Sequence, residues 1–169
     1  LDSSTVSNNI GAGGLAAIRI DTGPTTPVSA GNTRPGTLQM NSSIVARNGT
    51  TPDIGMSEPA LTVFAPNSLI GSVQAGVVLT GAPLQGIDPL LGPAMFNGGP
   101  TRTMALVAGS PAINTGSNPL NLTTDQRGLP RVSNARIDIG AVEVQVQTPV
   151  VPPVAPPAEP VPPDPTFTG

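Results

Sequence analysis

The sequence predicts an all-β protein: a short parallel β-helix followed by an irregular C-terminal cap and a polyproline tail. Three observations predict this fold. Short apolar runs alternate with Gly, Pro and Asn turns, and no run keeps a 3.6-residue apolar period for more than two turns, which disfavours long helices. A weak internal repeat recurs over the first 80 residues. Nine of the 22 prolines lie between residues 149 and 165.

The repeat defines the coils, which are expected over residues 1–80. Residues 2–9 (Asp-Ser-Ser-Thr-Val-Ser-Asn-Asn) align with residues 41–48 (Asn-Ser-Ser-Ile-Val-Ala-Arg-Asn) at a spacing of 39, and residues 67–71 align with residues 41–45 at a spacing of 26. A unit of about 25 residues with a polar residue, two small residues and an aliphatic pair is typical of one solenoid coil. The longer first spacing indicates an inserted loop over residues 22–36. A plain β-sandwich with an accidental repeat is the alternative.

The cap is expected over residues 81–147 and the proline-rich linker or tail over residues 148–169. Proline fixes φ and removes a backbone donor, so the tail should be polyproline II, a semi-rigid spacer. Just before the tail, over residues 139–147, valine alternates with polar residues, which predicts a strand with Val142, Val144 and Val146 on one face. This strand either closes its own cap or begins an arm that pairs with a neighbouring subunit as an assembly strand.

Charged residues gather in the predicted cap. Two cations, Arg127 and Arg131, follow Asp125 closely, and Asp138 and Glu143 come next along the chain. Because a guanidinium fork pairs well with carboxylates and carbonyls, we expect these five residues to hold the cap together as structural residues. A cation-binding role for the three carboxylates is the alternative, but no Asp-x-Asp-x-Asp loop accompanies them.

The composition excludes many functions. The chain has no His, Cys, Trp, Tyr or Lys; its seven cations are all Arg, and with ten acidic residues the net charge is −3. Zinc, haem and iron–sulfur sites need imidazole or thiolate ligands, and the common nucleophile systems need His, Cys or Lys. Seven scattered Arg do not form a nucleic-acid footprint, and no apolar run has the length of a membrane span. We therefore expect no cofactor, no bound metal, no nucleic-acid partner and no membrane insertion by this segment.

The composition still allows catalysis by carboxylates alone, and some parallel β-helices are enzymes that cleave polysaccharides. Glycoside hydrolysis needs two closely placed carboxylates, whereas the candidates are isolated from one another in the sequence: Asp21, Asp53, Glu58 and Asp88. A lyase needs a base of moderate pKa, and arginine is too basic for that task. The sequence thus predicts no enzyme and no catalytic residue. An adhesin or carbohydrate-binding module is an alternative, disfavoured by the 2% aromatic content.

The C-terminal half carries a series of short motifs. They are Asp-Pro-Leu-Leu-Gly-Pro at 88–93, Asn-Gly-Gly-Pro-Thr-Arg-Thr at 97–103, Gly-Ser-Pro-Ala-Ile at 109–113, Thr-Asp-Gln-Arg-Gly-Leu-Pro-Arg at 124–131 and Asp-Ile-Gly-Ala-Val-Glu at 138–143. Over residues 86–143 this series resembles the terminal segment of bacterial secreted right-handed parallel β-helix proteins of the choice-of-anchor Q type. One departure is Asn114, where the family commonly has Asp. The resemblance implies right-handed coils, a secreted or surface location and no enzymatic activity.

These observations predict an extracellular, non-enzymatic structural protein that assembles into a fibre or surface layer. Only 10% of the residues are charged, which disfavours a colloidally stable monomer. A short stack of coils also leaves an open sheet edge, which another strand can cover. The expected partners are further copies of this chain, joined through the coil edge and the C-terminal arm, or upstream coils of a longer parent chain. The start at Leu1 suggests a processed product or a piece of a longer protein.

Overall fold

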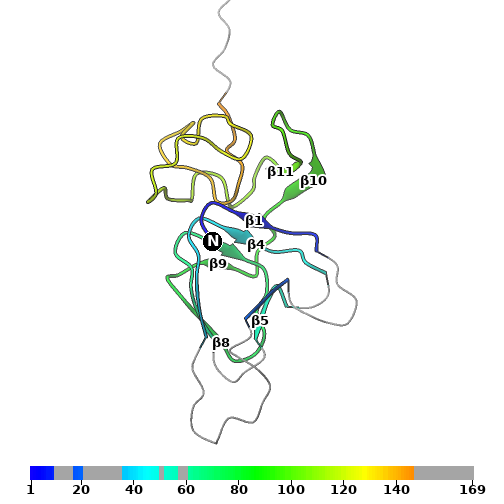
Figure 1. The fold of residues 1–169 in the computed structure, drawn as a ribbon, viewed down its shortest axis with the longest axis vertical. Helices are drawn as coiled ribbons and strands as arrows, with labels where there is room; N and C mark the ends of the chain where they lie inside the picture. The colour runs from blue at the N-terminus through cyan, green and yellow to red at the C-terminus, as the bar shows by residue number, and fades with distance from the viewer. Residues whose placement is uncertain (10–16, 21–35, 50–51, 57–60, 147–169) are drawn as a thin grey trace, which may run out of the picture.

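The computed structural model describes residues 1–9, 17–20, 36–49, 52–56 and 61–146 (Figure 1). These residues form short β-strands and no helix, which confirms the all-β prediction. The predicted tail, and all but the last residue of the predicted inserted loop, lie outside the described residues. The strands, in chain order, are β1 (Thr5–Val6), β2 (Ile18–Ile20), β3 (Gly36–Gln39), β4 (Ile44–Val45), β5 (Ile54–Met56), β6 (Leu61–Phe64), β7 (Leu69–Ile70), β8 (Val77–Thr80), β9 (Leu84–Gln85), β10 (Leu91–Met95) and β11 (Thr103–Leu106).

Parallel sheets make up the first part of the structure. The strand orders are β1-β4-β7-β9, β2-β5 and β3-β6-β8, and every neighbouring pair within them is parallel. The chain therefore passes through the same sheets repeatedly: first as β1, β2 and β3, then as β4, β5 and β6. The third pass runs through β7, a bridge from Val73 to Ile54, and β8, and β9 begins a fourth. Each pass lies beside the previous one (Figure 1).

The register confirms one predicted repeat spacing and corrects the other. Thr5 pairs with Ile44, which is the expected spacing of 39. Ile44 pairs with Leu69, so the second spacing is 25 and the predicted 26 is wrong. A slip of one residue would turn every side chain of the strand to the opposite face. The structure matches Asn67 with Ser42 and not with Asn41: both residues have left-handed backbones, with φ of 49° and 47°.

The two central strands of the four-stranded sheet, β4 and β7, are buried on both faces. One face contributes Val45 and Ile70 to the core enclosed by the parallel sheets, together with buried Met40, Ile54, Leu61, Val63 and Ala65. The other face contributes Ile44 and Leu69 to a second core with Leu91, Ala112 and Ile139. Residues 86–146, here called the C-terminal layer, therefore pack along the flank of this sheet. Figure 1 shows this layer next to β1.

The C-terminal layer contains one antiparallel hairpin, β10–β11, with a register shift between Leu91 and Ala94. It projects from the body beside β1 (Figure 1). The rest of the layer, residues 107–146, is irregular apart from an isolated bridge between Thr124 and Pro130. The strand predicted for residues 139–147 is absent over its described part, residues 139–146, so that prediction is wrong.

Candidate functional site

A row of serines connects successive passes at one corner. The backbone N–H of Ser4 donates to Ser43 Oγ, and that of Ser43 donates to Ser68 Oγ, both at 3.2 Å. Each serine hydroxyl in turn donates to the carbonyl two residues earlier: Asp2, Asn41 and Pro66. In each pass the preceding residue is left-handed: Ser3, Ser42, Asn67 and, in the last pass, Ala82. The corner therefore repeats four times with the same backbone geometry.

Strand β1 is an edge strand among the described residues. The carbonyls of Ser4 and Val6 accept hydrogen bonds from the N–H groups of Ile44 and Ala46 in the neighbouring pass. Since successive peptide groups of a strand point to opposite edges, the backbone groups of Thr5 and the N–H of Ser7 point away from β4. Ser4 Oγ lies at the same edge, where it can accept the next N–H of the row. Among the strands that the structure describes, none other than β4 pairs with β1, so this edge can accept another strand.

The two ends of the stack differ in chemistry. At the β1 end, the row continues to Ser4, and Val6 occupies the core-facing position. At the β9 end, the strand register places Pro83 at the position that Ser68 has in the previous pass. It places Gln85 at the position of Ile70. Proline has no N–H to donate, and an exposed glutamine closes the core-facing position with a polar group. The β9 end therefore has residues that disfavour pairing with a further strand. The β1 end has the residues of a pass that is paired on both sides.

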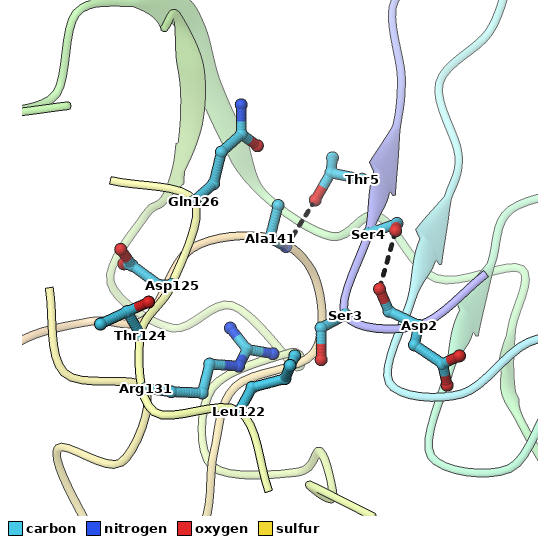
Figure 2. Close-up of a pocket in the computed structure, with 10 residues that line it drawn as sticks. All are labelled: Asp2, Ser3, Ser4, Thr5, Leu122, Thr124, Asp125, Gln126, Arg131 and Ala141. Atoms are coloured by element: carbon cyan, nitrogen blue, oxygen red, sulfur yellow. Dashed lines mark hydrogen bonds between the residues drawn. The ribbon is translucent and has the colours of Figure 1, made fainter. Parts of the chain in front are cut away.

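A groove runs between the β1 edge and the C-terminal layer. It consists of two cavities of about 420 and 210 Å³, which share Thr5, Gln126 and Ala141 in their walls. Figure 2 shows the larger one, with Ser4 and Thr5 on one side and Gln126 and Ala141 on the other. Ala141 N–H donates to Thr5 Oγ1 at 3.1 Å, which fixes the separation of the two walls. We call this feature the edge groove.

The five charged residues predicted to hold the cap lie together in the C-terminal layer. Asp125 accepts from the Nε and Nη2 of Arg127 at 2.9 and 2.7 Å, and Arg127 also donates to the carbonyl of Glu143. Arg131 donates to the carbonyls of Asp138 and Gly140 at 3.1 and 2.8 Å. Arg127 therefore contacts a backbone carbonyl of the C-terminal layer, and its carboxylate partner is Asp125.

The carboxylates of this cluster are fully engaged with backbone groups. Asp125 Oδ2 accepts from Glu143 N–H at 3.1 Å. Asp138 accepts from the N–H groups of Asn114 and Val144 at 2.8 and 2.6 Å. Glu143 accepts from Asp138 N–H at 2.9 Å. These bonds replace the regular hydrogen bonds that the irregular layer lacks.

Burial and hydrogen bonding set the protonation of the cluster. Burial raises the pKa of the Asp125 carboxyl, but hydrogen bonds from the Arg127 side chain and from backbone N–H groups outweigh it, so the pKa lies below its ordinary value. Burial raises the pKa of the Glu143 carboxyl, and the nearby Asp138 charge adds to this. Burial lowers the pKa of Arg131 despite the surrounding carboxylates. Two donor nitrogens of Arg131, Nε and Nη1, are buried without a hydrogen-bond partner among the described residues, although Nη1 lies 4.0 Å from Glu143 Oε2.

The predicted assembly strand has a different structure. Val142 is buried, Val144 is half-buried and Val146 is exposed, while Glu143 between them is fully buried. The N–H groups of Glu143, Val144 and Val146 donate to the side chains of Asp125, Asp138 and Ser133. These donors are not free for a partner strand. The alternation of valine and polar residues predicted a strand wrongly. Side-chain oxygens accept the N–H groups that a neighbouring strand would otherwise have bound, and no local sequence pattern reveals these acceptors.

The described residues contain no group of acidic side chains that could hold a metal ion, and no helix among them could cross a membrane. Of the carboxylates weighed for catalysis, Asp53 is buried and accepts from Asn48 and Ser72, and Asp88 caps the N–H of Leu90. Asp21 and Glu58 lie outside the described residues. The sequence reasoning missed Ser4, Ser43 and Ser68, although the recurring Ser after a polar residue was a visible signal.

Comparisons with known proteins add no assignment. No protein-family model matches the chain. A search of curated proteins found no similar sequence, and a search of solved structures found no similar fold.

Proposed function

We propose that this chain is a non-enzymatic structural module of an extracellular or cell-surface protein, and that its stacked passes are coils of a right-handed parallel β-helix. The observation that carries the proposal is the four-fold repetition of the left-handed corner in parallel register. A connection that returns a strand to the same parallel sheet is right-handed in nearly all proteins. Such repeats build an extended surface in which each coil contacts only its neighbours.

The charged cluster supports a structural role. Its carboxylates bind backbone N–H groups of Asn114, Asp138, Glu143 and Val144, and the Arg127 and Arg131 side chains bind carboxylate or carbonyl oxygens. A catalytic acid or base needs a lone pair or proton that faces a substrate. In this cluster the carboxylate oxygens accept hydrogen bonds from backbone N–H groups of the chain itself.

The difference between the two ends supports pairing with a partner at the β1 edge alone. Head-to-tail stacking would place Pro83 of one copy against Ser4 of the next, where the row requires an N–H. It would also place Gln85 over the core-facing Val6. The geometry thus favours a single joint at the β1 edge over the continuous fibre that the composition suggested.

Two measurements test the proposal. An antibody against this chain should label intact cells that produce the protein; labelling only after permeabilisation would contradict the surface assignment. Incubation with pectin, alginate and other polyuronides should release no reducing ends or unsaturated products. Product release that disappears in an Asp53→Asn or Asp88→Asn variant would replace the structural assignment with an enzymatic one.

A further inference from the structure

We infer that the edge groove is a docking site for one extended strand of a polypeptide other than a second copy of this chain, which binds parallel to β1 and carries the pattern of this chain's own coils. The inference rests on the proposed structural function and adds the identity of the partner strand. The incoming strand would form hydrogen bonds with the backbone of Thr5, the N–H of Ser7 and the Oγ of Ser4. β-Strand addition of this kind takes its affinity from main-chain bonds and its specificity from alternate side chains.

The bonds of the missing strand follow from those one pass below. There, Ser43 N–H donates to Ser68 Oγ, while Leu69 and Gly71 N–H groups donate to the carbonyls of Ser43 and Val45. If the same pattern is repeated one pass earlier, the incoming strand donates an N–H to Ser4 Oγ. Its carbonyls accept from the N–H groups of Thr5 and Ser7. The incoming residue at the row position must therefore have an N–H, which excludes proline.

Burial indicates which side chains the strand would carry. Ile44, Val45, Leu69 and Ile70 are all 0% exposed, whereas their counterparts in the first pass, Thr5 and Val6, are only half-buried. An aliphatic pair in the incoming strand would complete both cores, one residue over Val6 and the other in the groove beside Ala141. Ser7 Oγ, buried without a partner among the described residues, also lines the groove.

The second pass supplies the probe. A synthetic peptide with the sequence of residues 41–48 contains the row serine and the aliphatic pair of a coil. The control peptide carries Ser43→Pro and Val45→Pro, which remove the two N–H groups that would face β1. Nuclear magnetic resonance on the full chain should show slowed amide exchange at Thr5 and Ser7 with the first peptide at millimolar concentration, and none with the control.

Matched variants of the chain locate the site. Ser7→Pro should abolish binding, whereas Gln85→Pro, which removes an outward N–H at the opposite end, should leave it unchanged. Ser4→Ala, which keeps the β1 backbone, should weaken binding about two- to tenfold, the effect of one lost hydrogen bond.

Three results would overturn the inference. Equal binding of both peptides would show that backbone pairing is not involved. Protection around β8 and β9 in place of β1 would place the site at the wrong end. If the chain alone showed protected Thr5 and Ser7 amides together with a concentration-dependent rise in sedimentation coefficient, the occupant would be a second copy. None of these results depends on surface labelling or on the polyuronide assay, so the proposed function would fail or stand separately.

Discussion

The backbone N–H of Ser43 donates to Oγ of Ser68 at 3.2 Å, although 25 residues separate the two along the chain. Both side chains are almost completely buried, with exposed fractions of 0%. This bond links two passes at a point where the left-handed corner interrupts the strand ladder. The serine row thus continues the hydrogen bonding of the sheet around the corner.

Removing the middle serine should destabilise the stack. Ser43→Ala deletes the acceptor of Ser4 N–H and removes one of the two donors to the Asn41 carbonyl, which keeps only its bond from Ser3 N–H, so the free energy of unfolding should fall by about 1–3 kcal/mol. Ser4→Ala at the open edge deletes only a bond to the exposed Asp2 carbonyl and should cost clearly less. Urea unfolding of the two variants measures the difference. Equal losses would contradict the row as a stabilising feature.

Close packing of the C-terminal layer on the sheet should depend on Gly140. A Cβ there would lie 2.8 Å from Thr5 Oγ1 and 2.9 Å from Ile44 Cδ1, and the backbone has φ of +105°. Gly98 has a similar φ of +97° but nothing within 4 Å of the added Cβ. Gly140→Ala should therefore cost more than Gly98→Ala, which should show only the backbone strain of about 1–3 kcal/mol. Thermal unfolding of both variants measures the two losses of stability. The additional loss in Gly140→Ala is the cost of the steric clash, because both variants share the cost of backbone strain.

The ion pair within the layer should contribute strongly to stability. The side chain of Asp125 is 0% exposed and that of its partner Arg127 is 11% exposed. Arg127→Ala leaves the carboxylate buried without its cation, which should cost about 3–5 kcal/mol. Arg102→Ala is the matched control, because that exposed side chain lies over the Phe96 ring. If both variants melt at the same temperature, the structural role of Arg127 is wrong.

The raised pKa of Glu143 should appear in the pH dependence of stability. The ordinary value is 4.5; because the folded protein holds the proton more tightly than the unfolded chain, this group's contribution is complete below that value and is lost as pH rises through the folded pKa. Glu143→Gln cannot lose this proton. The difference in unfolding free energy between the variant and the parent should shift in favour of the variant as pH rises above 4.5.

Asp125 provides the opposite sign for comparison. Its pKa is lowered from 3.8, so its contribution is present above that value and is lost as pH falls through the folded pKa. The parent should therefore lose part of its advantage over Asp125→Asn below pH 3.8. Urea titrations over this pH range measure both effects. A Glu143→Gln difference that did not change with pH would show that the carboxyl is not perturbed.

The sequence was a good guide where the relevant interaction is local. Short apolar runs between turn residues predicted an all-β fold, and the recurrence of Asp2-Ser3-Ser4 as Asn41-Ser42-Ser43 predicted the register of β1 on β4. The nearness of Asp125 to Arg127 and Arg131 predicted a charged cluster in the layer. In each case the residues involved lie within one short segment, or repeat it.

What the sequence by itself determined is therefore the strand-forming material, the first repeat spacing and the exclusion of sites that need His, Cys or Lys. Tertiary structure alone decided the rest. It set the second spacing at 25, because both faces of β7 must be buried, and a slip of one residue would exchange Leu69 and Ile70 between the two cores. It also placed the N–H groups of residues 139–146 beside the side-chain acceptors Asp125, Ser133 and Asp138, which lie 18, 13 and 6 residues from their donors, at spacings that no strand periodicity reveals. These bonds replaced a predicted strand by an irregular segment.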